Sequence, residues 1–317
     1  MIGTDSRVFN SKILLFGEYS ILHDSMALAV PYPLFQGQLA FKRVTQSSQK
    51  LAQSNQELQA FSNYISLKIR EKELETDFDF SSLAFDIAQG LYFESTIPQG
   101  FGVGSSGALT AALYDRYSEE KPTVNASEIT VKDILALKKV LGKMESHFHG
   151  SSSGMDPLIC YLNKPLLIRS KDHIQITQVP PFKKDKGAIF LLNTGRPRRT
   201  EPLVSLYLEK CKNPDFAALC KDKLAPCADA AIAAFLDYQK DDLLNAVAHI
   251  SRFQWEHFQP MIPTLFADIW KKGLDTGAYH LKLCGAGGGG FILGFTDDFS
   301  KAREILQHQL MRVIYEI

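Results

Sequence analysis

Apolar residues recur every three to four positions in several stretches of the chain, which is the spacing of amphipathic helices. Residues 58–72 show this spacing first, and residues 131–149 show it again with Ile134, Leu137 and Leu141 on one face. Further helices are expected over residues 108–117, 201–211, 215–236, 241–258 and 262–272, and after residue 299. The second half of the chain is therefore expected to be mostly helical.

Shorter apolar or alternating runs lie between these stretches and predict strands. They are found at residues 12–16, 27–43, 85–93, 165–168, 174–179, 188–192, 278–284 and 291–295. Pro31 and Pro33 are expected to break the second run, because proline cannot donate a hydrogen bond to a strand ladder. The chain of 317 residues is long enough for two domains. A charged turn at 183–187 is the expected boundary, which divides the chain into residues 1–186 and 187–317.

The composition is that of an ordinary globular protein, with 45% hydrophobic and 22% charged residues. The formal net charge is zero, so nothing indicates a nucleic-acid or acidic-membrane partner. No apolar run reaches the ~18–20 residues that a membrane span needs. Residues 1–11 are polar and lack the apolar core of a signal peptide. The five cysteines form no C-x-x-C pair, which indicates reduced thiols in a cytoplasmic protein.

A glycine-rich loop precedes the expected helix at 108–117. Glycines alternate with other residues and run into two serines, in the order Pro98, Gly100, Gly102, Gly104, Ser105, Ser106 and Gly107. Glycine permits close approach of the backbone, and a helix N-terminus adds partial positive charge, so the loop can cradle a phosphate. It matches neither the Walker pattern nor the dinucleotide-binding pattern. The alternative is a plain glycine turn before a core helix.

Two further segments accompany this loop, at residues 12–22 and 282–291. In their order along the chain the three segments resemble the signature motifs of the GHMP kinases (galactokinase, homoserine kinase, mevalonate kinase and phosphomevalonate kinase). The resemblance spans nearly the whole chain. It implies a two-domain α+β GHMP kinase fold, with a ribosomal-protein-S5-like N-terminal domain, a ferredoxin-like C-terminal domain and the active site between them. It also implies ATP and Mg²⁺ as cofactors, with the phosphates bound by the residues of the central glycine loop.

A kinase needs one carboxylate that helps to hold Mg²⁺ and another beside the acceptor hydroxyl. The segment from Glu145 to Asp156 resembles a mevalonate kinase pattern, which implies that Glu145 binds the metal together with Ser106 and that Asp156 is catalytic. Lys12 would lie near Asp156, keep it ionised and lower the pKa of the substrate hydroxyl. The alternative is a helix end followed by a solvated aspartate in a serine turn.

His147 and His149 flank the same helix end and invite a metal interpretation. We reject it, because the two histidines fall on different faces of the helix end and no cluster with zinc-ligand spacing accompanies them. His149 is instead expected to satisfy backbone groups at the turn.

The segment 193–200 resembles the Asn-Thr-x-x-Pro-Arg-x-Thr segment of mevalonate kinases, so (R)-mevalonate is the expected acceptor in isoprenoid biosynthesis. Arg198 could grip the substrate carboxylate with its planar fork of donors, unless the segment is only a cationic loop. The implied acceptor site consists of Glu18, Tyr19, Ser153, Gly154, Arg198, Thr200, Gly285, Ala286 and Gly287. Cys284 stands where the family often has a hydroxyl residue, so only a backbone role is expected there.

Some residues favour other interpretations. Tyr19, where mevalonate kinases usually carry His, and Gly107 are more typical of phosphomevalonate kinases, although those enzymes usually show Pro-Ala-Ser-Thr in place of Pro197-Arg198-x-Thr200. Galactokinase fits poorly, because the Gly-Glu-His-Thr-Asp signature is absent. A non-catalytic binding module of the same fold is a third alternative. The expected partners are a small acidic alcohol and, in a homodimer, a second copy of the chain.

Overall fold

The computed structural model describes residues 7–41, 48–122, 129–170, 172–181, 185–198 and 201–317. The chain divides into two compact units, of which unit 1 consists of residues 1–12, 31–98 and 103–164. Unit 2 consists of residues 13–30, 99–102 and 165–317. Strands β1 (Phe9–Phe16) and β2 (Ala27–Phe41) each contain residues of both units. Each unit is described by itself below.

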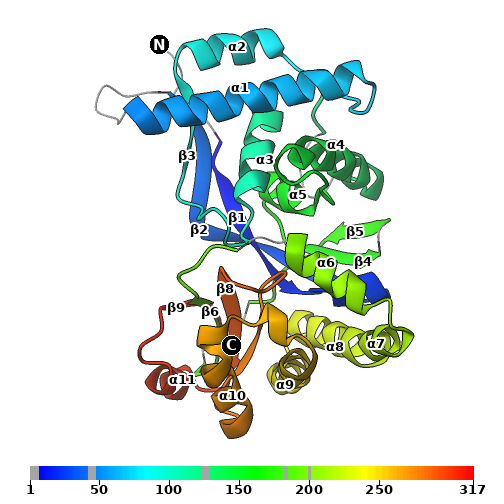
Figure 1. Ribbon diagram of the computed structural model, residues 1–317, viewed down its shortest axis with the longest axis vertical. Coiled ribbons are helices and arrows are strands. Elements are labelled where there is room, and N and C mark those ends of the chain that lie inside the picture. Colours follow the sequence, from blue (N-terminus) through cyan, green and yellow to red (C-terminus); the bar gives the residue numbers. More distant parts are fainter. Residues whose placement is uncertain (1–6, 42–47, 123–128, 171, 182–184, 199–200) are drawn as a thin grey trace. The chain divides into compact units, whose positions relative to one another are not determined.

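Unit 1 contains the part of β2 from Pro31 onward, together with a group of helices. Its other elements are α1 (Ser48–Arg70), α2 (Phe80–Ala88), β3 (Leu91–Ser95), α3 (Ser105–Tyr117), α4 (Val131–His149) and α5 (Met155–Leu162). Strand β3 pairs antiparallel with β2, from Gly37 opposite Ser95 to Phe41 opposite Leu91. Helix α3 packs against α4 and α5, and the three lie together in Figure 1. This packing brings the N-terminus of α3 next to the N-terminus of α5.

Two expectations for unit 1 are wrong. The strand expected over residues 85–93 is the end of α2 followed by a short β3. Asp79 caps α2 by accepting a hydrogen bond from the backbone of Ser82, and the buried Leu83 and Ile87 are spaced for a helix. The break expected at Pro31 and Pro33 is also absent, because β2 is continuous through both.

The registers of β2 with β3 and β4 both leave out its two prolines. Residues 27–29 pair with β4 (Leu166–Ser170) and residues 37–41 pair with β3. Pro31 and Pro33 lie between these two ladders, where neither register needs their missing N–H groups. Strand β5 (His173–Ile176) continues the sheet beyond β4.

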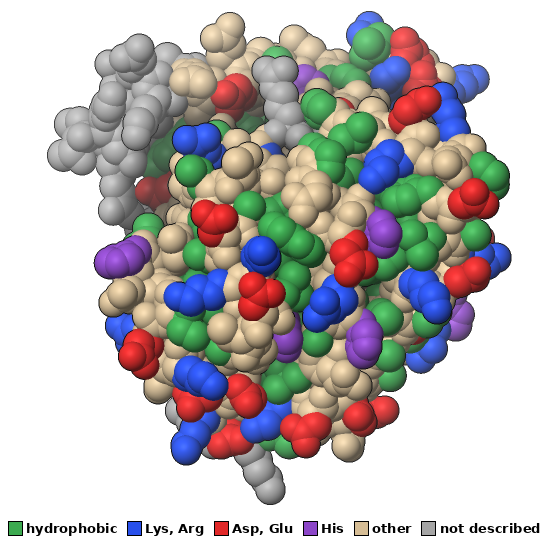
Figure 2. All heavy atoms as spheres, turned by 60° about the horizontal axis from the view of Figure 1, so that its bottom comes forward, with side chains coloured by type: hydrophobic (Ala, Val, Ile, Leu, Met, Phe, Trp, Pro, Cys, Tyr) green, Lys and Arg blue, Asp and Glu red, His purple; other side chains and the backbone are tan. Residues whose placement is uncertain are grey.

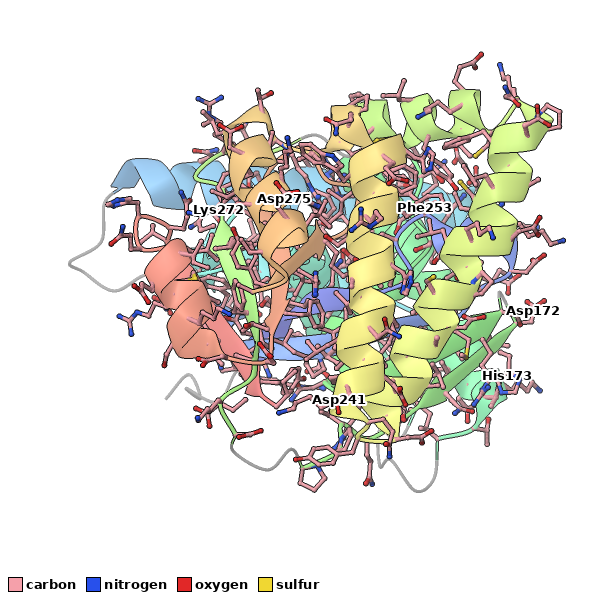
Figure 3. The ribbon with its side chains drawn as sticks, turned by 90° about the horizontal axis from the view of Figure 1, so that it is seen from below. Asp172, His173, Asp241, Phe253, Lys272 and Asp275 are labelled. Carbon is pink, nitrogen blue, oxygen red and sulfur yellow. The ribbon has the colours of Figure 1, made fainter. Side chains whose placement is uncertain are left out.

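Unit 2 contains a four-stranded antiparallel sheet in the order β7 (His280–Leu283), β8 (Phe291–Thr296), β6 (Ala188–Asn193) and β9 (Met311–Glu316). Its helices are α6 (Glu201–Lys210), α7 (Pro214–Leu219), α8 (Ala225–Leu236), α9 (Lys240–His257), α10 (Ala267–Thr276) and α11 (Phe299–Ile305). Short turns are η1 (Ser20–His23), the π-helical turn η2 (Cys220–Leu224), η3 (Gln259–Met261) and η4 (Thr264–Phe266). Helices α8 and α9 lie side by side, with Phe253 on α9 (Figure 3).

The helices expected in this half are present, with two modifications. The helix expected over residues 262–272 begins later, as α10 over Ala267–Thr276, and the turn η4 precedes it. The expected helix over residues 215–236 is divided by the π-helical turn η2 into α7 and α8. Strand β9 has no counterpart in the sequence analysis, because its side chains are mostly half-buried or exposed and show little apolar alternation.

The molecular surface carries charges of both signs. On the face shown in Figure 2, acidic and basic side chains drawn in colour are interspersed with apolar ones. Within the described part of the chain, no helix combines the length and the apolar character that crossing a membrane requires.

Candidate active site

The central glycine loop ends at the N-terminus of α3, in unit 1. Gly104 is the N-cap of this helix and has a φ of +85°, which favours glycine. The first N–H groups of a helix have no partner within it, and the helix dipole adds positive charge at the same point. Ser105 and Ser106 stand in this first turn, both half-buried. The arrangement suits a bound anion.

Asp156 lies in the first turn of α5, beside the N-terminus of α3. A Cβ atom on Gly107 would lie 2.8 Å from the carbonyl carbon of Asp156, so only glycine permits this approach of the two helices. Gly154, the N-cap of α5, similarly packs against the backbone of α4, where a Cβ would lie 2.1 Å from the Lys138 carbonyl oxygen. These two glycines place the Asp156 carboxylate next to the candidate anion site.

Lys12 pairs with Asp156. Its Nζ lies 2.9 Å from Oδ1 of Asp156, and the lysine side chain is 9% exposed while that of Asp156 is 37% exposed. The backbone N–H of Lys12 donates to the carbonyl of Val103, which fixes the strand beside the glycine loop. A buried ammonium thus faces a carboxylate that remains accessible, and the two lie as close together as the resemblance implies.

Glu145 is buried in the C-terminal part of α4, and two serine hydroxyls donate to its carboxylate. The Ser106 hydroxyl is 2.9 Å from Oε1, and that of Ser152 is 2.5 Å from Oε2. Burial, and after it the negative charge of Asp156, raise the pKa of Glu145 from 4.5 to about 7. Two carboxylates and a serine hydroxyl, all oxygen donors, thus stand together at the anion site. This donor set fits Mg²⁺.

The two histidines at the end of α4 have different surroundings. His149 Nε2 lies 3.0 Å from the Ser106 hydroxyl, so the expectation that it satisfies backbone groups missed this side-chain contact. The ring of His147 stacks on Phe61, with a centroid separation of 5.1 Å. Among the described residues, no group of three or more His, Cys, Asp or Glu side chains is arranged to hold a metal ion.

In unit 2, Arg198 lies between two glycine segments. A Cβ on Gly102 would lie 2.0 Å from Nη2 of Arg198, and one on Gly285 would lie 2.6 Å from the same atom. The backbone N–H of Arg198 donates to the Gly100 carbonyl at 2.8 Å, and its Nη1 donates to the Gly287 carbonyl at 2.9 Å. Gly100 and Gly102 therefore accommodate Arg198, in addition to their expected place in the phosphate loop.

The first motif contacts the segment Cys284–Gly290, here called the third glycine segment. Glu18 forms a buried ion pair with Lys282, whose Nζ also donates to the carbonyls of Leu15 and Leu283. The carboxylate of Glu18 also accepts from the backbone N–H of Gly285. The Tyr19 hydroxyl donates to the Ala286 carbonyl at 2.7 Å. The polar groups of Glu18 and Tyr19, both expected to bind substrate, are thus engaged within the protein.

The predicted site residues fall into one group in each unit. Unit 1 brings together Lys12, Gly104, Ser105, Ser106, Gly107, Glu145, Gly154 and Asp156. Unit 2 brings together Glu18, Tyr19, Gly100, Gly102, Arg198, Gly285, Ala286 and Gly287. Pro98 is half-buried, Ser153 is exposed and its hydroxyl accepts a long hydrogen bond from the Met155 N–H, and Thr200 lies outside the described residues.

Two participants were not predicted. Ser152 holds Glu145, and Lys282 holds Glu18. A signal for Lys282 existed, since a lysine between Leu281 and Leu283 in a strand must find a partner if it is buried. No signal singled out Ser152, because it is one of three consecutive serines that look alike in the sequence.

Family models match the chain at two places. The model described as the GHMP kinases N terminal domain matches residues 69–164, and the model for GHMP kinases C terminal matches residues 242–308. Together they cover about half of the chain. The chain belongs to the GHMP kinase family, whose members are ATP-dependent phosphotransferases acting on alcohols, and it has the two-domain α+β fold of that family.

Solved structures of kinases that bind different small molecules share this fold. L. major mevalonate kinase in complex with R-mevalonate is 16% identical with a TM-score of 0.61, over 98% of this chain and 95% of that one. Streptococcus pneumoniae phosphomevalonate kinase in complex with phosphomevalonate and AMPPNP is 16% identical with a TM-score of 0.59, over 98% and 99%. Lactococcus lactis galactokinase complexed with galactose is 12% identical with a TM-score of 0.62, over 98% and 93%. No curated protein sequence matched the chain.

Proposed function

We propose that this GHMP kinase transfers the γ-phosphoryl group of ATP to the primary hydroxyl of (R)-mevalonate. The observation that carries the proposal is the ion pair of Lys12 and Asp156 beside the N-terminus of α3. It combines a carboxylate that can accept a proton with a helix N-terminus that can bind phosphate. Phosphoryl transfer depends mainly on positioning and on neutralising charge, and this group supplies both.

The unit 1 residues are assigned to the nucleotide and to proton transfer. The backbone N–H groups at the start of α3 would bind phosphate oxygens. Asp156 would accept the proton of the acceptor hydroxyl, and the ammonium of Lys12, 2.9 Å from Asp156, would stabilise the developing alkoxide. Ser106 and Glu145 would hold Mg²⁺, which, when bound, neutralises charge on the transferring phosphoryl group.

The unit 2 residues are assigned to the acceptor. Arg198 donates from Nη1 to the Gly287 carbonyl, and its guanidinium is proposed to donate to the substrate carboxylate as well. The assignment to mevalonate rests on the resemblance of the segment 193–200. The backbone of the third glycine segment belongs to the same assignment, and Ser153 and Gly154 of unit 1 and Thr200 are assigned to the acceptor by resemblance alone.

Phosphomevalonate is the second candidate acceptor, because Arg196 and Arg198 could balance the roughly two additional negative charges of a phosphomonoester. Tyr19 also favours this candidate by resemblance. Gly107 favours it by resemblance too, and in this chain the close approach of Asp156 also calls for a glycine at that position.

An ADP-release assay with mevalonate, phosphomevalonate, galactose and homoserine tests the proposal. We expect the highest kcat/KM with mevalonate. A much higher kcat/KM with phosphomevalonate would replace mevalonate by the second candidate. ATP binding without turnover of any acceptor would instead identify a non-catalytic binding module.

A further inference from the structure

Tyr19 has a backbone conformation that is unusual for its residue type. Its φ is 62° and its ψ is −38°, a region that residues with bulky side chains rarely adopt. Such strain persists only where the surrounding structure enforces it, and it is concentrated at functional sites. Here the ring packs against Tyr207, with centroids 4.4 Å apart, and against Phe258 at 5.3 Å. The result is that the phenol reaches the third glycine segment.

The acceptor of the Tyr19 hydrogen bond is the carbonyl of Ala286, at 2.7 Å. Ala286 stands between Gly285 and Gly287, whose φ values are +73° and +80°. Glycine neighbours leave a peptide free to adopt several orientations. Because a peptide is planar and moves as a unit, holding the carbonyl of Ala286 also fixes the N–H of Gly287.

The phenol of Tyr19 is suited to this task. Its side chain is buried, and burial raises its pKa, so the hydroxyl keeps its proton and remains a donor throughout the pH range of enzyme assays. Since this proton is given to Ala286, the hydroxyl does not serve as a donor to the acceptor substrate. This changes the role expected for Tyr19 from binding substrate to holding the segment that does.

We propose that Tyr19 is a positioning residue, which holds the Ala286–Gly287 peptide in the orientation that the acceptor site requires. The inference rests on the proposed function for its kinetic consequence. A protein whose binding-competent conformation is only partly populated binds with an affinity reduced by that fraction. Losing the hydroxyl should therefore raise the KM of the acceptor more than it lowers kcat.

The test compares Tyr19→Phe with Tyr279→Phe. Both tyrosines are buried, and both hydroxyls donate to a backbone carbonyl at 2.7 Å, that of Ala286 for Tyr19 and that of Ile269 for Tyr279. Each variant loses one hydroxyl and keeps its ring. The two measurements are amide hydrogen exchange of residues 284–290 and steady-state kinetics with mevalonate. Exchange of β8 in the same samples reports whether each variant is folded.

We expect Tyr19→Phe to speed exchange in residues 284–290 by about 3–10-fold and to raise the acceptor KM by a similar factor, the range for one net hydrogen bond. Its kcat should change by less than about twofold, and Tyr279→Phe should change neither quantity. Unchanged exchange, or an unchanged KM, in Tyr19→Phe would overturn the proposal. If the wild-type protein phosphorylates no acceptor, the proposed function fails, and the exchange measurement still decides the role of Tyr19.

Discussion

At the scale of single residues, the accessible Asp156 and the buried Lys12 differ in a way that suits their proposed roles. Replacing Asp156 by Asn keeps the shape of the side chain and removes its basicity. Turnover should fall by about 10²–10⁴-fold, the usual worth of acid–base assistance, while ATP binding is retained. Steady-state kinetics and calorimetric titration with Mg·ATP measure the two effects.

The matched control for this variant is Asp115→Asn. Asp115 also pairs with a cation in unit 1, Arg7 at 2.7 Å, and belongs to neither group of site residues. Its variant should keep wild-type turnover. Normal turnover in Asp156→Asn would remove that residue from the catalytic assignment.

The second prediction concerns Glu145 and the pH dependence of the free energy of unfolding. Its pKa is raised to about 7 in the folded protein, so it contributes stability that is fully present below about pH 4.5 and is lost as the pH rises through 7. Gln resembles the protonated acid and lacks this loss. Without metal, the wild type should therefore lose free energy of unfolding between about pH 5 and about pH 8, relative to Glu145→Gln. The difference between the variant and the wild type should shift in favour of the variant over this range. Urea titrations at both pH values measure the difference.

The buried Glu18 also has a raised pKa, but it is present in both proteins and cancels in this comparison. The same variant should raise the Mg²⁺ concentration needed for activity if Glu145 holds the metal. Parallel pH profiles of stability for the two proteins would show that Glu145 is ionised in the folded state as it is in the unfolded chain.

At the scale of elements, the N-terminus of α3 depends on Gly104. An added Cβ would lie 2.9 Å from Cγ of Lys12 and would also meet a φ of +85°. Gly104→Ala should therefore displace Lys12 and lower kcat by about tenfold or more, the scale of a misplaced catalytic group. Gly277→Ala is the control, since Gly277 has a φ of +66° with no atom within 4 Å of the added Cβ. Equal kcat values for the two variants would contradict the role given to Gly104.

Lys282 joins the ends of β1 and β7. Replacing it by Met leaves the Glu18 carboxylate buried without its cation, which typically costs about 3–5 kcal/mol. The double variant Lys282→Met, Glu18→Gln no longer has an unpaired buried carboxylate, so it should recover part of the lost free energy of unfolding. Urea unfolding of the wild type, the two single variants and the double variant measures these free energies. If the effects of the two single changes simply add in the double variant, the two residues do not act as a pair.

The elements show what could be predicted from the sequence. Helix α4 is present over the predicted residues 131–149, because its apolar spacing is regular and Thr130 and Asp133 form a capping box. The strand expected over 85–93 was wrong, because a short apolar run cannot distinguish a strand from a buried helix end. The engagement of Glu18 with Lys282 was beyond prediction, since it joins residues 264 positions apart.

At the scale of the whole molecule, the chain passes between the two units near residues 12, 30, 98, 102 and 164. Each unit thus depends on segments distant in sequence. Unit 2 needs residues 13–30, so a fragment that ends at residue 164 contains that segment without its partners. We expect this fragment to be cleaved rapidly by trypsin while the full chain resists. A protease-resistant fragment would show that unit 1 folds alone.

The division of β1 has a consequence for the protein as it leaves the ribosome. Leu15 is held by Lys282, and that lysine is synthesised 267 residues later. At about 5–20 residues per second, the second half of β1 waits for well over ten seconds before its anchor emerges. Throughout that time an apolar segment stands exposed, so the nascent chain should be a client of the chaperones that bind such segments.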